Sequence, residues 1–366
     1  MTDTYCDGTV QPHTFSENIR ENSMISKRVA LLLCFFVMLS AGKIYASDLS
    51  QVCNSVCAKI REIVTDSPFV VAVYTERSLV DAKGEASKGA GIGTGIVIAL
   101  EGGTVGVLTN NHVIDEPLAS RIWVSFAGQE FMQTVTVVGR DPAADLALLS
   151  APRQLPSNMR PAVLAKQIEL GQQVYALGYP FGVRSPSFGY VNTKESFSWL
   201  YAWTQAPANP GNSGGPVFNE KHEVVGINTA IIRGATTTFV FPIEYVHKIL
   251  PRLMREGVVH HAATGFTFED ASHISPIFFE NLGLKYPPEE DWVMALDIDP
   301  GSYAARAGVT KGDVIIRFNG APVKSARDLD KKIFFDHHPN EPAVFTMRRG
   351  AQEFERHIVL TERSSK

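Results

Sequence analysis

The stretch NPGNSGGPVF, residues 209–218, places Ser213 in a glycine-rich segment. Glycine lets the backbone turn tightly, and it leaves neighbouring N–H groups uncovered, so that they can point at a developing oxyanion. A serine alone is a poor nucleophile and needs a base and a group that orients the base. The stretch therefore predicts a nucleophilic serine, and the alternative is a glycine-rich turn without chemistry.

The two partners that such a serine needs stand upstream, each beside an apolar run. His112 follows a strand-like run in the motif TNNHV, and Asp145 opens the run DLALL. A buried aspartate is costly unless it is paired, as it would be with a histidine N–H. The chain order histidine, aspartate, serine is one known order of a catalytic triad. Asp141 and Asp115 are rival acids, and each residue alone could be structural, so the combination carries the prediction.

Around these motifs the chain has the pattern of an all-β protein. Residues 68–241 contain short β-branched or aromatic runs separated by Gly, Pro, Asn and Asp, which is typical of a barrel or sandwich. A length of about 170 residues suits two small barrels. The expected strands are Phe69–Tyr74, Ile96–Ala99, Val105–Thr109, Ile122–Phe126, Val135–Val138, Val174–Leu177 and Val224–Asn228.

After the strands, apolar residues recur at helical spacing over 243–257, where Gly257 ends the pattern. Pro251 lies inside this pattern and is expected to kink or split the helix. Residues 260–264 have the composition of a linker, which few contacts should cross. The tail that follows mixes strands and helices and forms a further unit.

Two pairs of adjacent histidines stand in polar surroundings, His260-His261 and His337-His338. Adjacent side chains point in different directions, so such a pair rarely binds one metal. We expect both pairs to be solvated, and we expect no metal and no cofactor.

The amino end has the three parts of a secretory signal. Lys27 and Arg28 precede the apolar run Val29–Leu39, and small residues lead to a cleavage site after Ala46. The apolar run is about half the length that spans a bilayer. A cleaved signal is the prediction, and an uncleaved membrane anchor is the alternative.

Composition excludes several classes of protein. The chain has 366 residues, of which 45% are hydrophobic and 20% charged, and its formal net charge is -4. This is ordinary globular composition, without the basic field that nucleic acid requires. Cys53 and Cys57 would share one face of a helix over 49–64, which leaves open both a disulfide and two buried thiols.

Together these motifs resemble those of the HtrA (Deg) serine proteases, which have a chymotrypsin-like fold. The resemblance rests on TNNHV, DLALL and NPGNSGGPVF, and it continues in GYPFG and GINTA. It implies a protease domain in which His112 is the general base, Asp145 orients it and Ser213 attacks the scissile carbonyl. The backbone N–H groups of Gly211 and Ser213 would form the oxyanion hole.

The tail resembles the PDZ domain of the same family through the motifs DPGSYAARAG and KGDVI. Such a domain takes an extended C-terminal peptide by adding it to a sheet edge. The groove would lie between a strand at Gly265, Phe266, Thr267 and Phe268 and a helix over 325–335. Backbone N–H groups near Phe266 would hold the peptide carboxylate.

Three features depart from the family pattern. Gln205 stands where the family usually has an acid, and Thr94 stands where it often has a serine. The carboxylate loop matches the PDZ pattern loosely. Residues 271–291 are expected to form an insertion or a long loop.

The expected fold is mainly β, with a chymotrypsin-like double β-barrel followed by an α+β PDZ domain. The expected segments are an extension with a signal peptide (1–46), a helical segment (47–66), the protease domain (67–257), a linker (258–264) and the PDZ domain (265–362).

The resemblance also predicts a specificity pocket. In chymotrypsin-like folds the residue six before the nucleophile lies at the pocket floor, and here it is Pro207. Ala208 flanks it, and Ile227 is expected in a wall. No acid lies between Thr204 and Ser213, so cleavage is expected after Val, Ala, Ile or Leu, with little after Lys, Arg, Asp or Glu.

The resemblance implies a secreted, periplasmic endopeptidase that acts without ATP in envelope quality control and the stress response. Its partners would be unfolded or misfolded proteins, and C-terminal peptides at the PDZ groove. The family is commonly trimeric, and Phe69 and Tyr74 are candidates for such an interface. One alternative is a regulatory protease that is anchored in the inner membrane, faces the periplasm and cuts a specific partner. The other is a non-catalytic peptide-binding chaperone.

Overall fold

The structure is a computed structural model that describes residues 46–80, 86–115, 121–128, 131–194, 200–231, 237–286 and 292–364. Apart from Ala46, the predicted signal peptide lies outside these residues. Within them, no helix is both long enough and apolar enough to cross a membrane. The described residues fall into two units, with the boundary between Asp66 and Ser67.

The first unit contains the helix α2, over Ala46–Thr65. It covers the segment in which the sequence predicted a helix. Cys57 is a free thiol there, whereas the side chain of Cys53 lies outside the described residues.

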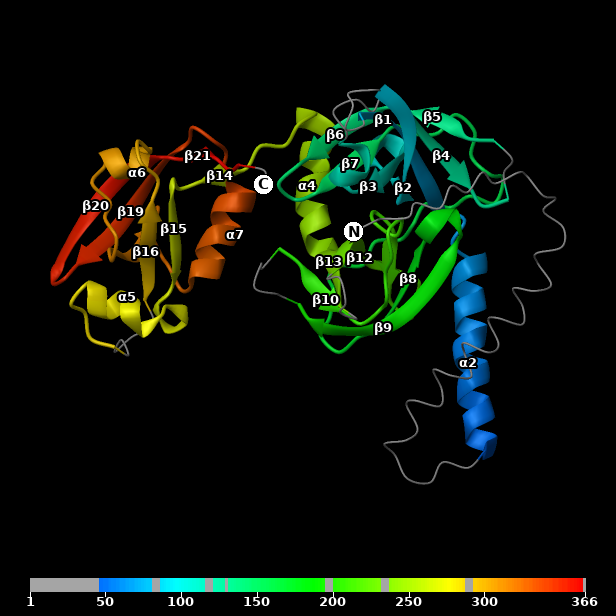
Figure 1. Cartoon of the computed structure of the whole chain (residues 1–366), viewed down its shortest axis with the longest axis horizontal. Helices are drawn as coiled ribbons and strands as arrows, with labels where there is room; N and C mark the ends of the chain where they lie inside the picture. The colour runs from blue at the N-terminus through cyan, green and yellow to red at the C-terminus, as the bar shows by residue number, and fades with distance from the viewer. Residues whose placement is uncertain are drawn as a thin grey trace, which may run out of the picture. The chain divides into compact units, whose positions relative to one another are not determined.

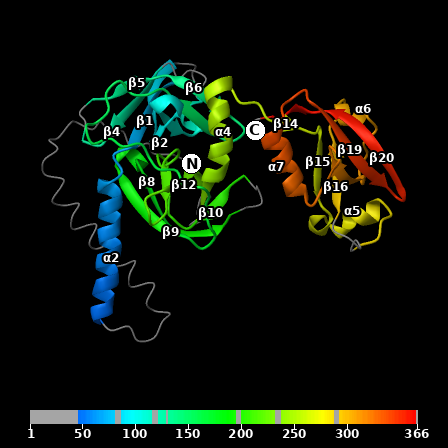
Figure 2. The ribbon, with the colours of Figure 1, turned by 180° about the vertical axis from the view of Figure 1, so that it is seen from behind.

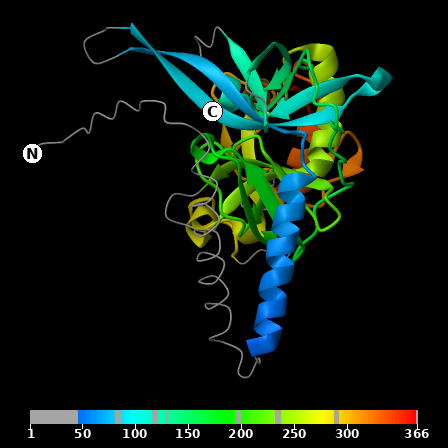
Figure 3. The ribbon, with the colours of Figure 1, turned by 90° about the vertical axis from the view of Figure 1, so that its right-hand side faces the viewer.

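The second unit begins with a seven-stranded antiparallel sheet in the order β5-β4-β1-β2-β3-β7-β6. Its strands are β1 (Val70–Val80), β2 (Ala86–Ala99), β3 (Val105–Thr109), β4 (Ile122–Phe126), β5 (Gln133–Val135), β6 (Val137–Asp141) and β7 (Leu146–Leu149). β1 and β2 pair from Val70 opposite Ile96 to Val80 opposite Ala86. Figure 3 shows these two light-blue strands reaching past the rest of the sheet.

Six further strands close into a barrel in the order β10-β13-β12-β11-β8-β9. They are β8 (Gln173–Gly178), β9 (Ser185–Thr193), β10 (Ala202–Thr204), β11 (Pro216–Phe218), β12 (Val224–Ile231) and β13 (Thr238–Pro242). Phe218 and Phe241 are fully buried in its core. The short helical elements of this half are η1 (Glu101–Gly103), α3 (Asn111–Ile114) and η2 (Pro180–Gly182).

Phe69 belongs to this core and is unavailable to a partner subunit. Its side chain is 6% exposed, and its ring meets that of Phe218 edge-on, with centroids 5.9 Å apart. The predicted contribution of Phe69 to a trimer interface is therefore wrong, because an apolar run at the start of a domain can equally supply its core.

The helix α4 runs unbroken from Ile243 to Glu256, with Pro251 inside it. The predicted split is wrong. Pro251 lies on the exposed face, so the carbonyl that its missing N–H leaves free faces solvent instead of a dry core. Gly257 follows with a φ of 71°, a left-handed conformation suited to the end of a helix.

The remaining strands form the sheet β15-β16-β17-β19-β20, with β18 paired to β17, and the small pair β14-β21. Their bounds are β14 (Ala262–Ala263), β15 (Phe266–Asp270), β16 (Val293–Ile298), β17 (Val314–Phe318), β18 (Ala321–Pro322), β19 (Pro342–Arg349), β20 (Gln352–Val359) and β21 (Thr361–Glu362). The helices are η3 (Ala271–His273), α5 (Pro276–Asn281), α6 (Tyr303–Arg306) and α7 (Ala326–Asp336). Figures 1 and 2 show α7 alongside β15, the edge strand of this sheet.

The segment expected to be an insertion or long loop has structure of its own. η3 and α5 lie within 271–291, and Ile274 and Phe279 pack with Met294 and Val314 in a small core. Phe279 is fully buried. The aromatic pair Phe278-Phe279 of this segment therefore packs against residues of β16 and β17.

The expected linker is bonded on both of its sides. The backbone N–H of Arg140 in β6 donates to the carbonyl of Gly257 at 2.8 Å, and the carbonyl of Arg140 accepts the N–H of Val259 at 2.9 Å. Further along, Ala262 and Ala263 pair with β21. The segment thus continues one sheet and then joins another, so the prediction that few contacts cross it is wrong.

Gly139→Ala should destabilise the fold, because β6 and α4 approach closely at this residue. A Cβ at Gly139 would lie 2.0 Å from the carbonyl oxygen of Leu253 in α4. Backbone shifts of this kind cost about 1–3 kcal/mol or more. Thermal unfolding should show a clear fall in the melting temperature. The control is the neighbouring residue Val138, which is 40% exposed. Val138→Ala should leave the melting temperature nearly unchanged. Equal behaviour of the two variants would contradict the close approach.

Candidate active site

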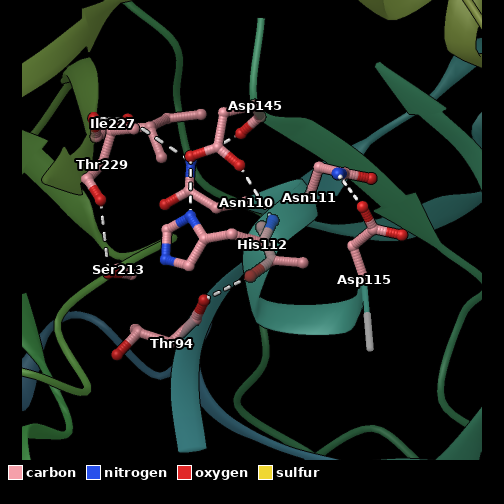
Figure 4. A network of polar contacts seen from close by, with 10 residues as sticks. Thr94, Asn110, Asn111, His112, Asp115, Asp145, Ser213, Ile227 and Thr229 are labelled. Carbon is pink, nitrogen blue, oxygen red and sulfur yellow. Dashed lines mark hydrogen bonds and ion pairs between the residues drawn. The ribbon is translucent and has the colours of Figure 1, made fainter. Parts of the chain in front are cut away.

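His112 and Asp145 are brought together by two neighbouring strands. β3 and β7 pair with Thr109 opposite Ala147, and His112 lies in α3 directly after β3. Both carboxylate oxygens of Asp145 contact His112: Oδ1 accepts its backbone N–H at 2.8 Å, and Oδ2 lies 2.7 Å from Nδ1. The second ring nitrogen, Nε2, is turned towards the side of Ser213 (Figure 4).

Asp145 has a backbone φ of 55°, a left-handed conformation that costs a non-glycine residue about 1 kcal/mol or more. Neighbouring hydrogen bonds hold it there. Its carbonyl accepts the Asn110 amide at 2.7 Å, and the same amide donates to the Thr229 hydroxyl at 3.3 Å. The preceding turn is closed by Asp141, whose Oδ1 accepts the N–H of Ala144 at 2.9 Å.

Ser213 lies on the turn between β10 and β11. Its carbonyl accepts the N–H of Thr94 at 2.8 Å, which ties the turn to β2. Its hydroxyl donates to the carbonyl of Thr229 at 3.3 Å, and among the described residues no hydrogen bond joins it to His112. Catalytic hydrogen bonds are often long in structures without substrate. A rotation about χ1 is the movement that would turn this hydroxyl towards Nε2.

The turn that carries Ser213 presents two uncommitted N–H groups. Gly211 has a φ of 104°, which glycine adopts freely, and its carbonyl accepts the Thr94 hydroxyl at 2.7 Å. Within the described part of the chain, the N–H groups of Gly211 and Ser213 have no hydrogen-bond partner. They are the groups that the sequence assigned to an oxyanion hole.

Thr94 has a role that the sequence did not reveal. Its side chain is fully buried. Its hydroxyl accepts the N–H of Tyr179 at 3.0 Å besides donating to Gly211, and its carbonyl accepts the Thr109 hydroxyl at 2.7 Å. Gly214 packs so closely that a Cβ there would lie 2.2 Å from the same carbonyl. The sequence offered one sign of this role, the position of a hydroxyl residue between Gly93 and Gly95.

A pocket of about 220 Å³ opens beside Ser213. Its lining residues are Ala208, Asn209, Pro210, Asn212, Ser213, Asn228, Thr229, Ala230 and Thr238. Of the three residues predicted for the specificity pocket, Ala208 is present, and Pro207 and Ile227 are absent. Pro207 lies on the exposed side of its turn, where its carbonyl accepts the Ser187 hydroxyl at 2.7 Å, and Ile227 is fully buried in the core.

The pocket wall comes from an irregularity in β12. The register with β13 shifts between Asn228 and Ala230, and such a bulge re-aims side chains. Asn228 is 1% exposed, and its carboxamide has no hydrogen-bond partner among the described residues. Among the residues that the structure describes, no charged side chain lines the pocket, so the chemistry of this lining suits an uncharged group.

The two rival acids are engaged elsewhere. Asp115 contacts Arg140 at 2.7 Å and accepts the Asn111 amide at 3.1 Å. Asp141 is fully buried and lies 2.6 Å from Nε2 of His261. Neither carboxylate is directed at His112, so Asp145 is the acid that the fold places beside it.

The paired histidines are less solvated than predicted. The side chain of His260 is 53% exposed, but that of its neighbour His261 is fully buried. His337 is 17% exposed and lies 2.9 Å from Glu341, and His338 contacts a guanidinium nitrogen of Arg252 at 3.2 Å. Neighbours on an irregular segment point in opposite directions, so one of a pair can be buried while the other is exposed.

The four residues predicted for the PDZ groove form one continuous turn and strand. Gly265 has a φ of 76°, and Phe266 and Phe268 pack ring to ring, with centroids 5.9 Å apart. The Thr267 hydroxyl accepts a backbone N–H of β16 at 3.1 Å. The N–H of Phe266 donates to the Thr264 hydroxyl at 3.3 Å, so this one of the N–H groups near Phe266 is occupied within the chain.

Two family models match the chain. A trypsin-like peptidase domain matches residues 93–227, and a PDZ domain matches residues 280–359. The predicted order of a mainly β, trypsin-like domain followed by a PDZ domain is confirmed.

Curated relatives and solved structures agree with these matches. A DegP-like periplasmic serine endoprotease of Pseudomonas putida is 32% identical over 250 residues, which cover 65% of this chain and 49% of the relative. The serine protease HhoA of Synechocystis sp. is 31% identical over 258 residues, which cover 66% of this chain and 64% of the relative. The chain thus spans about half the length of the DegP-like relatives it matches.

The HtrA-type protease AlgW with a decapeptide has a similar fold, with a TM-score of 0.67, 22% identity, and coverage of 83% of this chain and 99% of AlgW. A serine endoprotease from Yersinia pestis has a TM-score of 0.62 at 24% identity and covers 83% of this chain and 98% of its own. The domain order, the curated relatives and the fold agree, and the chain belongs to the HtrA family of serine proteases, with one PDZ domain.

Proposed function

We propose that the protein is a serine endopeptidase in which Ser213 attacks the carbonyl of a peptide bond. The observation that carries the proposal is the ring of His112, which Asp145 fixes at 2.7 Å on the side of Ser213. The two uncommitted N–H groups of Gly211 and Ser213 support it. This set provides a nucleophile, a base, an orienting acid and an oxyanion site.

Each group has one task in the reaction. Nε2 of His112 takes the proton as the Ser213 oxygen attacks, and it later gives that proton to the leaving amine. The N–H groups of Gly211 and Ser213 bind the oxyanion of the tetrahedral intermediate. Asp145 accepts hydrogen bonds from the backbone N–H and Nδ1 of His112, so it fixes the tautomer and stabilises the imidazolium. Water then releases the acyl group by the same steps in reverse.

The pocket beside Ser213 supports cleavage after small or aliphatic residues. A buried cationic or anionic side chain would find no opposite charge among the lining residues, at a cost of several kcal/mol. An aliphatic side chain gains about 0.8 kcal/mol per buried methylene. Val, Ala, Ile and Leu are therefore the proposed residues before the cut.

The PDZ domain is proposed to recruit or sense C-terminal peptides. β15 is an edge strand and lies beside α7, an arrangement to which an extended peptide can add as a further strand. The matched PDZ region begins at residue 280, after β15, and the Phe266 N–H is already bonded to Thr264. Binding of a carboxylate at Phe266 would therefore have to displace the Thr264 hydroxyl.

The setting of the activity is proposed from the relatives. The DegP-like relatives are named periplasmic endoproteases, which supports a periplasmic protein with a cleaved signal ending at Ala46. Unfolded or misfolded proteins are the proposed substrates, in envelope quality control, and a homotrimer is the proposed assembly.

Ser213→Ala should abolish peptide hydrolysis and leave the fold intact. Loss of the nucleophile typically costs several orders of magnitude in rate. The rate that remains comes from substrate binding and the oxyanion site. Casein digestion measures turnover, and a serine-reactive phosphonate labels the nucleophile. Turnover of the variant at the wild-type rate would sink the assignment, and a wild-type protein that neither digests casein nor takes the label would favour a non-catalytic chaperone.

Asp145→Asn should lower kcat by about four orders of magnitude, because an amide group facing His112 favours the wrong tautomer of the ring. The matched control is Asp115→Asn, since Asp115 directly follows α3, the helix that carries His112, but pairs with Arg140 on the surface. Steady-state kinetics on a peptide substrate compares the two. A damaging Asp115→Asn with a silent Asp145→Asn would show that the acid was wrongly chosen.

Fragments of casein should end in Val, Ala, Ile or Leu. In Ala208→Val the pocket is narrower, so cuts after Leu should fall about tenfold relative to cuts after Ala, the scale set by one or two methyl groups. Sequencing the fragment ends measures both. A majority of cuts after Lys or Arg would refute the pocket assignment, and a majority after Asn, Gln, Ser or Thr would make the Asn228 carboxamide the selector instead.

A further inference from the structure

The position of Asp145 depends on the turn that precedes it. β6 and β7 pair with Asp141 opposite Leu146, so the intervening residues form a short connection that ends at Asp145. Oδ1 of Asp141 caps this turn through the N–H of Ala144. Whatever fixes the Asp141 side chain therefore also fixes the turn that presents the catalytic acid.

The second oxygen of Asp141 is bound by a residue from the segment between the two domains. Its Oδ2 lies 2.6 Å from Nε2 of His261, and both side chains are fully buried. The other ring nitrogen, Nδ1, lies 2.7 Å from the carbonyl oxygen of Phe334 in α7. The carbonyl accepts a hydrogen bond from Nδ1, and Nε2 shares a hydrogen bond with the Asp141 carboxyl group, so both ring nitrogens are bonded.

His261 is held in this position by the groups around it. Its ring stacks on that of Phe334, with centroids 3.6 Å apart. Its carbonyl accepts the N–H of Arg363 at 2.8 Å, and Arg252 of α4 donates to the preceding carbonyl, that of His260, at 2.8 Å. The histidine therefore has one available orientation, with its Nε2 edge on Asp141.

A row of aromatic rings links α7 with Tyr201, directly before β10. Burial raises the pKa of Tyr201, and the charges of Asp145 and Asp141 raise it further. The centroid distances are 6.0 Å from Tyr201 to Phe241, 6.0 Å from Phe241 to Tyr245 and 5.0 Å from Tyr245 to Phe335 of α7. α7 thus packs against the protease domain through these rings, and it contacts the catalytic turn through His261.

We infer that His261 is a positioning residue for the catalytic acid. It acts through Asp141, whose carboxylate shapes the turn that ends at Asp145, and Asp145 in turn orients His112. The inference rests on the proposed proteolytic activity. It assigns to the segment between the domains a part in setting the turnover rate, separate from any binding of substrate.

The test compares three variants of the full chain. His261→Leu removes both ring nitrogens and leaves the buried Asp141 carboxyl group without its partner, so kcat should fall about tenfold with KM within about twofold of the wild type. His261→Gln keeps an N–H donor for Asp141 and should recover most of kcat. His260→Leu changes the exposed neighbour and should leave kcat and KM unchanged. In His261→Leu, the low-field proton resonance of Nδ1 of His112 should also shift or broaden.

The outcomes separate this inference from the proposed function. Labelling of wild-type Ser213 by a phosphonate establishes the activity independently, and its absence would refute the proposed function. With labelling present, a folded His261→Leu with wild-type kcat and an unchanged His112 resonance would overturn the positioning role, as would a loss confined to KM or one that His261→Gln shares in full. If His261→Leu does not fold, His261→Asn, whose shorter amide falls short of Asp141, takes its place under the same criteria.

Discussion

The carboxylate of Asp145 accepts two hydrogen bonds from a single residue, and the geometry of the active site depends on them. The bonds to the backbone N–H and Nδ1 of His112 join the end of β3 to the start of β7. They fix the side on which Nε2 is presented. Asp145 can accept both because its backbone is left-handed, and that conformation is retained only while Asn110 and the capped turn support it.

Thr94 plays the corresponding part on the other side of the site. Its N–H and its hydroxyl donate to two carbonyls of the Ser213 turn, those of Ser213 and Gly211, and its carbonyl accepts a hydrogen bond from the end of β3. The nucleophile comes from one sheet and the base from the other. A single buried residue of β2 therefore aligns the two halves of the active site. This role needs a side-chain hydroxyl, which threonine and serine both have. Threonine can therefore stand where serine is common.

Much of the fold and of the active site could be predicted from the sequence, because they follow from local patterns. β3 and β4 have the bounds that their β-branched runs indicated, and the motif around Ser213 carried its own turn chemistry. The failures arise where distant segments meet. The burial of His261 depends on Asp141, 120 positions away, and no composition or spacing near residue 261 encodes that contact.

The pocket shows a second kind of failure. The strand β12 was predicted, and the resemblance placed Ile227 on it in the pocket wall, but Ile227 is buried and the next three residues of the strand line the pocket instead. The register of β12 with β13 shifts between Asn228 and Ala230. Such a bulge depends on both paired strands, so the sequence of one strand does not determine it. The wrong prediction at Pro251 has a similar cause. Whether α4 can contain this proline depends on which side of the helix faces solvent, and the helix sequence alone does not determine that.

The bonded segment over 257–263 bears on how this architecture can change in evolution. Domains that are joined by a flexible linker without contacts can be exchanged between proteins, because neither domain depends on the other for its core. Here the tether carries a side chain that completes the interior of its neighbour, because His261 occupies a dry site against Asp141 and Phe334. A carboxy-terminal domain transplanted together with its tether would leave Asp141 without its hydrogen-bond partner unless the new tether supplied a replacement for His261. The two domains of this chain are therefore expected to be inherited together, with residues 141, 261 and 334 changing as a set.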